Sequence, residues 1–155
     1  MPSYTNAETK IPKLLLDYVE SRRSALGLPV VGTLPFLEQL SASYRTLPCV
    51  VFYAQSWKAP HRMLLHLTVN VDLIAKADDT TAANENDYVA ALRFALTDWS
   101  AFDAYLSALS LGNRTGWRMN GYKVEDGGIE IDGAAESRTR RTTLTIRCQA
   151  TEAAH

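Results

Sequence analysis

The stretch His61-Arg-Met-Leu-Leu-His-Leu-Thr-Val-Asn-Val-Asp-Leu-Ile-Ala75 decides the fold. Within it, apolar residues recur at every second position from Met63 to Leu73, and mostly polar residues lie between them. Successive side chains of a strand point to opposite faces, so the pattern predicts a long strand with one apolar and one mostly polar face. We interpret this strand as the centre of an antiparallel sheet.

Other apolar stretches predict the neighbours of this strand. Residues 47–55 predict a strand just before it, and the short link at 56–60 indicates a hairpin, hence antiparallel pairing. Later strands are expected at 117–125, at 129–131 and at 143–149, with the turn Asp126-Gly-Gly128 between the first two.

Spacings of three and four between apolar residues predict amphipathic helices at 10–26 and 86–99, the second continuing past a break near 98–100. Pro12 is expected in the first turn of the first helix, and Gly27 at its end. A short helix is also expected at about 35–44. The predicted fold is therefore α+β: a single antiparallel sheet, helices mainly on one face, in the order α-β-β-α-β-β.

The length of 155 residues favours one domain, 1–155, with flexible tails at 1–8 and 150–155. The net charge of −1 gives no global basic field, so sequence-specific nucleic-acid binding is not expected. No apolar run approaches the roughly 20 residues that cross a bilayer, and the N-terminus lacks an apolar signal core, so neither a membrane span nor secretion is expected.

The residues that usually carry chemistry form no catalytic pattern here. Cys49 and Cys148 each lie in a predicted strand; we expect two buried thiols, although a bridge between neighbouring strands stays open. His61 and His66 are five residues apart, which places them on opposite faces of a strand, so no shared metal is expected. The chain has no phosphate-binding loop and no nucleophile elbow. We therefore expect no enzyme activity, no metal and no cofactor.

Two charged clusters and one aromatic residue are candidates for recognition. Asp78 and Asp79 lie in a polar loop that lacks the spacing of a calcium site. A basic cluster precedes the last strand, and it faces either an acidic protein partner or a phosphate backbone: Arg138, Arg140 and Arg141, with Arg118, Lys123 and Arg147 on nearby strands. Trp57 lies in a hairpin link beside Lys58, a combination typical of interface hot spots.

Landmarks spread over about residues 10–150 resemble one family. An amphipathic helix precedes the strand Pro48-Cys-Val-Val-Phe-Tyr53, and an aromatic turn leads to the long alternating strand. A polar acidic link and a helix opening on Asp87-Tyr88 follow. A Gly121-Tyr122 strand, a glycine-containing acidic turn and an alternating last strand complete the series. In this order the chain resembles bacteriophage tail terminator proteins, also called tail completion or head–tail joining proteins.

The resemblance implies a non-enzymatic structural protein of the virion. Members of the family form rings, commonly hexameric, that cap the tail tube, stop its polymerisation and join the tail to the head. The implied partners are a second copy of the chain, the tail tube protein and a head completion or neck protein. The implied location is the tail–neck junction of a virion made in the cytoplasm of a bacterial host.

On this interpretation the candidate interface residues are the hairpin residues Trp57, Lys58, His61 and Arg62, the loop residues Asp78 and Asp79, and the basic residues Arg138, Arg140 and Arg141. Three alternatives stay open at this point. They are another role in phage neck or tail assembly, a small ligand-binding or catalytic α+β domain with a pocket over the sheet, and a nucleic-acid-binding module built on the arginine cluster.

Overall fold

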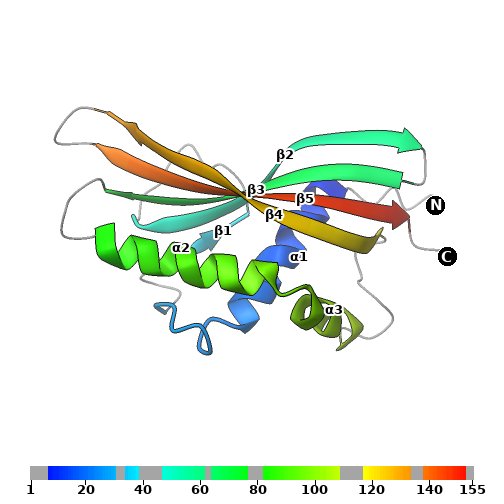
Figure 1. The fold of residues 1–155 in the computed structure, drawn as a ribbon, viewed down its shortest axis with the longest axis horizontal. Helices are drawn as coiled ribbons and strands as arrows, with labels where there is room; N and C mark the ends of the chain where they lie inside the picture. The colour runs from blue at the N-terminus through cyan, green and yellow to red at the C-terminus, as the bar shows by residue number, and fades with distance from the viewer. Residues whose placement is uncertain are drawn as a thin grey trace.

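A five-stranded sheet with helices on one side forms the fold (Figure 1). The computed structural model describes residues 7–30, 34–38, 47–61, 64–76, 82–108, 117–133 and 138–152. The elements in chain order are α1 (Ala7–Ser21), β1 (Phe36–Leu37), β2 (Cys49–His61), β3 (Leu64–Lys76), α2 (Ala82–Thr97), α3 (Trp99–Ala108), β4 (Trp117–Asp132) and β5 (Thr139–Glu152). No helix among these residues is long and apolar enough to cross a membrane.

The expected sheet, strictly antiparallel with elements in the order α-β-β-α-β-β, is wrong. The sheet is mixed, with strand order β1-β2-β3-β5-β4, because β1 pairs in parallel with β2. The described elements also include a third helix, since the chain breaks at Asp98 into α2 and α3. That break lies where the spacing of apolar residues placed it.

The strand that decides the fold occupies the middle of the sheet, as predicted. β3 pairs with β2 on one side and with β5 on the other, antiparallel in both cases. Its residues 65, 67, 69, 71 and 73 are buried against the helices, in a core that also contains Val50, Phe52, Leu144 and Ile146. Residues 66, 68, 70, 72 and 74 of β3 alternate with these and therefore point to the other side of the sheet. The helices leave that side uncovered (Figure 1).

The helices close the core with aliphatic side chains and with a cluster of aromatic rings. The ring of Phe102 in α3 has no exposed surface, and its centroid lies 4.9 Å from that of Tyr18 in α1. Trp99 lies 5.7 Å from Phe102 and 5.1 Å from Tyr122 of β4. Edge-to-face rings at these distances add to the stabilisation from buried area.

The start of the helix expected at 35–44 is wrong, because residues 36 and 37 form β1, and residues 39–44 lie outside the described part of the chain. The backbone N–H of Val50 donates to the carbonyl oxygen of Pro35 at 3.0 Å, which aligns this segment beside β2. The buried guanidinium of Arg23 lies 3.9 Å from the ring centroid of Phe36 and donates to the carbonyl oxygen of Leu34 at 3.1 Å. These contacts hold the segment in an extended conformation. A strand of two residues is too short to produce an alternating pattern in the sequence.

The first helix begins earlier than its apolar spacing indicates. α1 starts at Ala7, so Pro12 lies inside the helix rather than in its first turn. α1 also ends earlier than expected, at Ser21 rather than at 26, and hydrogen-bonded turns follow it. Gly27, at the end of these turns, has the left-handed conformation expected there, with a φ of 69°.

The turn expected at Asp126-Gly-Gly128 is a bulge within one continuous strand. The register of β4 against β5 shifts between Asp126 and Gly128, and pairing then continues to Asp132. A Cβ atom at Gly127 would lie 2.9 Å from the carbonyl oxygen of Thr143, so this position has no room for a side chain. β4 lies beyond β5, at one edge of the sheet.

Candidate functional site

The side of the sheet opposite the helices carries a network of polar side chains. The carboxylate of Asp72 accepts hydrogen bonds from the hydroxyls of Thr143 at 2.7 Å and Tyr53 at 2.9 Å. The amide of Asn70 donates to the hydroxyl of Tyr53 at 3.1 Å and accepts from the hydroxyl of Thr145 at 3.3 Å. The network joins β2, β3 and β5 on this face, which we call the open face.

Asp72 is the most buried member of the network, with 0% of its surface exposed. Burial raises the pKa of its carboxyl above the ordinary value, and the hydrogen bonds from Thr143 and Tyr53 oppose that rise. The guanidinium of Arg141 lies 3.7 Å from the same carboxylate and continues to Glu130 at 4.0 Å. Both oxygens of Asp72 are therefore occupied, and the group connects strands.

One end of the open face is basic. Lys58 pairs across the sheet with His66, and Lys123 pairs with Arg147 in a neighbouring row. All four side chains are exposed. Among the described residues, one carboxylate contacts this group: that of Glu125, which lies 3.2 Å from Arg147 and 3.8 Å from Lys123.

A hollow of about 410 Å³ is lined by three of these basic residues, His66, Lys123 and Arg147. Its lining includes Thr68, Gly121 and Gln149 as well as His66 and Arg147. Gly121 follows a register shift in β4 and has no side chain to fill the space, so the hollow opens at this bulge. We call Lys58, His66, Lys123 and Arg147, with this hollow, the basic end.

The other end of β4 exposes apolar and acidic side chains on its two faces. Ile129 and Ile131 are 54% and 59% exposed, and they lie on the helix side because Ile131 pairs with Arg140, which contacts α2. Glu130 and Asp132 alternate with them on the open face and are also exposed. We call residues 129–132 the hairpin tip.

A groove of about 350 Å³ separates the hairpin tip from α2. Val89 and Arg93 of α2 line one side, and Asp126 and Ile129 of β4 line the other. The guanidinium of Arg93 lies 3.0 Å from the carboxylate of Asp126 and bridges the two sides. Because both groups are exposed, this ion pair contributes little to the stability of the fold.

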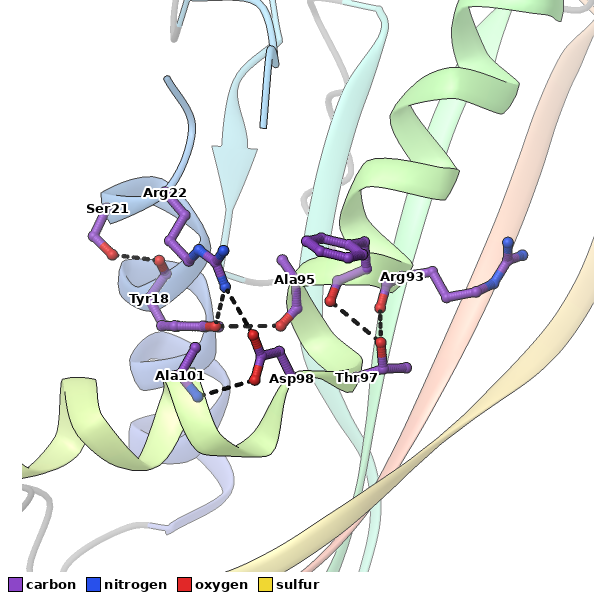
Figure 2. Close-up of polar contacts among 9 residues, drawn as sticks. Tyr18, Ser21, Arg22, Arg93, Ala95, Thr97, Asp98 and Ala101 are labelled. Carbon is purple, nitrogen blue, oxygen red and sulfur yellow. Dashed lines mark hydrogen bonds and ion pairs between the residues drawn. The ribbon is translucent and has the colours of Figure 1, made fainter. Parts of the chain in front are cut away.

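A second set of polar contacts joins the helices (Figure 2). The hydroxyl of Tyr18 donates to the carbonyl oxygen of Ala95 at 3.3 Å and accepts from Arg22 at 2.9 Å. Arg22 also lies 3.8 Å from Asp98, whose carboxylate accepts from the backbone N–H of Ala101 at 3.1 Å. Asp98 therefore caps α3 and ties it to α1, a structural role.

Among the residues predicted to form an interface, those that the structure describes lie on both faces of the sheet. Lys58 is exposed in β2, whereas Trp57 and His61 lie in the same strand with side chains outside the described part. Arg62, Asp78 and Asp79 also lie outside the described residues.

The predicted arginine cluster does not remain together in the folded chain. Arg140 projects to the helix side, where it donates to Asn86 at 3.0 Å and lies 3.7 Å from Glu85. Arg141 projects to the open face toward Asp72. Arg138 is exposed just before β5. Two of the three arginines therefore contact acidic residues of their own chain.

The two cysteines are free thiols on opposite faces of the sheet. Cys49 packs with Val51 and Ile74 on the open face, and Cys148 lies in the core against the helices. Burial raises the pKa of Cys49 to about 11 and that of Cys148 to about 12. Among the described residues, no cluster of three or more His, Cys, Asp or Glu side chains has the geometry of a metal site.

Sequence reasoning did not single out the buried polar network or the hairpin tip. The alternation of β3 does place Asn70 and Asp72 on its polar face, but nothing local indicates that Asp72 is buried. Ile129 and Ile131 looked like a short separate strand, and their exposure follows only from the position of β4 at the edge of the sheet.

The sequence matches no model of a known protein family and no curated protein.

Proposed function

We propose that the chain is a structural protein that forms a ring, as a phage tail terminator does. In this role it caps the tail tube, stops tube polymerisation and joins the tail to a head completion protein at the tail–neck junction. The proposal begins from the order of landmarks in the sequence. The single observation that carries it further is the exposed apolar pair Ile129 and Ile131 on an edge strand.

An exposed pair of isoleucines on an open edge is unfavourable for an isolated subunit. Natural edge strands are usually protected by charged residues, prolines or bulges, because an unpaired apolar strand recruits other chains. β4 carries bulges at both ends, at Gly121 and at Gly128, but Ile129 and Ile131 lie beyond the second bulge. A neighbouring subunit that covers this tip would remove the liability and gain the burial free energy.

The open face favours assembly in a second way. Its buried polar network holds three strands in fixed register, so the exposed side chains around it are presented on a rigid surface. Rings require a contact between two different surfaces of the same subunit, repeated until it closes. The hairpin tip and the basic end are two such different surfaces, at opposite ends of the sheet.

The solution mass of the purified chain tests the proposal. Light scattering should give a multiple of the 17.2 kDa chain, six copies for a hexamer, and negative-stain images should show rings. A subunit that is monomeric alone should form rings when tail tube protein is added, and should halt tube elongation. A chain that stays monomeric and leaves tube growth unchanged would exclude the terminator role.

A further inference from the structure

We propose that the basic end of one subunit binds the acidic hairpin tip of a second copy. The inference rests on the ring-forming function, and it names the two surfaces that meet. The occupant follows from charge: the basic end has more cations than its own carboxylate neutralises, and the tip presents carboxylates.

The basic end has an unbalanced charge. Lys123 and Arg147 share the single carboxylate of Glu125. Lys58 and His66 contact no acidic group in the described part of the chain. The hollow beside them therefore offers cationic and hydrogen-bond-donating groups to an incoming anion, and it has room for carboxylate side chains.

The hairpin tip supplies such carboxylates. Asp132 is exposed and makes no ion pair with any described residue, and Glu130 is held only by Arg141 at 4.0 Å. Both acids lie on the open face, with Ile129 and Ile131 on the other side of the same strand. The tip thus combines an acidic face with an apolar one.

The spacings of the two surfaces agree. Glu130 and Asp132 are two residues apart in β4, so their side chains are separated by about 7 Å along the strand. His66 and Thr68 are also two residues apart, in β3. Lys58 lies beside His66, and Arg147 lies beside Thr68, so these two rows of residues across the strands are about 7 Å apart. One carboxylate can therefore meet each row.

The two surfaces cannot meet within one subunit. On β5 the nearest positions of the two surfaces are Arg141, the partner of Glu130, and Arg147 of the basic end, six residues apart, or about 20 Å along the strand. A second copy is needed to bring them together, and each subunit then offers one surface to each neighbour. An acidic segment of another protein is the alternative occupant, and the test separates it from the second copy.

Paired charge reversals test the contact. The first variant carries Lys58→Glu and Lys123→Glu, and the second carries Glu130→Lys and Asp132→Lys. Each should lose the assembly, falling to the 17.2 kDa mass of one chain, because its two surfaces now repel. An equimolar mixture should regain the assembly, since the acidic surface of the first variant meets the basic tip of the second.

The recovery on mixing depends on this pairing and cannot arise from misfolded subunits. Lys10→Glu, an exposed reversal on α1, is the matched control and should leave the mass unchanged. Circular dichroism of each variant should match that of the wild type. The wild-type assembly should also weaken as salt is raised from about 0.1 M to about 1 M, because rim charges are screened.

The outcomes separate the inference from the function on which it rests. Wild-type rings that both variants still form would overturn the contact and leave the ring function standing. Folded monomeric variants that do not reassemble on mixing would overturn it too, and would point to an acidic partner of another kind. A wild-type dimer disrupted by the reversals would support the contact but contradict the ring. A wild type that is monomeric under all conditions would overturn both.

Discussion

Asp72 shows how a single buried carboxylate can determine the stability of the sheet. It is fully buried and accepts hydrogen bonds from Thr143 and Tyr53. We expect Asp72→Ala to lower the free energy of unfolding by about 2–3 kcal/mol, because it leaves buried hydroxyls without their acceptor. Urea denaturation monitored by circular dichroism measures this loss.

The matched control for Asp72 is an acidic residue on the same face that is exposed. Asp132→Ala should change the free energy of unfolding of the monomer by no more than about 0.5 kcal/mol. Equal losses in the two variants would show that the network does not hold the strands together.

The raised pKa of Asp72 predicts a specific pH dependence. Burial is its largest cause, so the folded chain binds the proton more tightly than the unfolded chain, whose value is near 3.8. Its contribution to stability is complete below the unfolded pKa and is lost as pH rises through the higher folded pKa. The free energy of unfolding of the wild type minus that of Asp72→Asn should therefore fall as pH rises from the unfolded value of 3.8 through the higher folded value. A difference that rises over this range would contradict the direction of the shift.

The sequence could not predict this network, because its contacts connect distant residues. Tyr53 and Asp72 are 19 residues apart, and Thr143 and Asp72 are 71 apart. The local alternation of β3 assigns Asp72 to a polar face but says nothing about which strands flank it. Burial of the carboxylate depends on the pairing of β2 and β5 with β3, which only the tertiary structure provides.

At the scale of elements, the break between α2 and α3 is the feature with the clearest local cause. Asp98 accepts a hydrogen bond from the backbone N–H of Ala101 and lies near Arg22 of α1. We expect Asp98→Ala to cost about 1 kcal/mol of unfolding free energy, because α3 loses its N-terminal cap. Asp98→Asn should retain most of that stability, since its side-chain oxygen still accepts the bond. Chemical denaturation distinguishes the two, and identical losses would refute the capping role.

The elements were predictable where periodicity runs through many residues. β3, α1 and the α2–α3 break follow from alternation or from spacings of three and four, each repeated several times. β1 has only two residues and depends on Arg23 and Phe52, which lie in other elements. Gly127 and Gly128 resemble a turn in sequence, yet the close approach of Thr143 makes them a bulge. Such pairs of glycines are ambiguous until the neighbouring strand is known.

At the scale of the molecule, the helices cover one side of the sheet (Figure 1). The basic end and the acidic tip lie at opposite ends of the other side. The basic end draws one residue from each of four strands, and its outermost members, Lys58 and Arg147, are 89 residues apart in the sequence, so composition alone gives only a near-neutral total. The arginine cluster that the sequence singles out is divided between two faces instead. The separation of a basic end from an acidic tip therefore depends on the order in which the strands pair in the sheet.

The hairpin tip gives the last prediction. Replacing Ile129→Thr and Ile131→Thr together keeps β-branched residues in the strand but removes most of the exposed apolar surface. The free energy of unfolding of the monomer should change by no more than about 0.5 kcal/mol, since both side chains are more than half exposed. The oligomer should dissociate, because a subunit contact that covers this tip loses its burial free energy. Light scattering across a dilution series measures the effect.

Phe94→Ala removes an equally exposed apolar side chain, 62% exposed on α2, and should leave the mass unchanged. If the two variants weaken assembly equally, the contact is not centred on the hairpin tip.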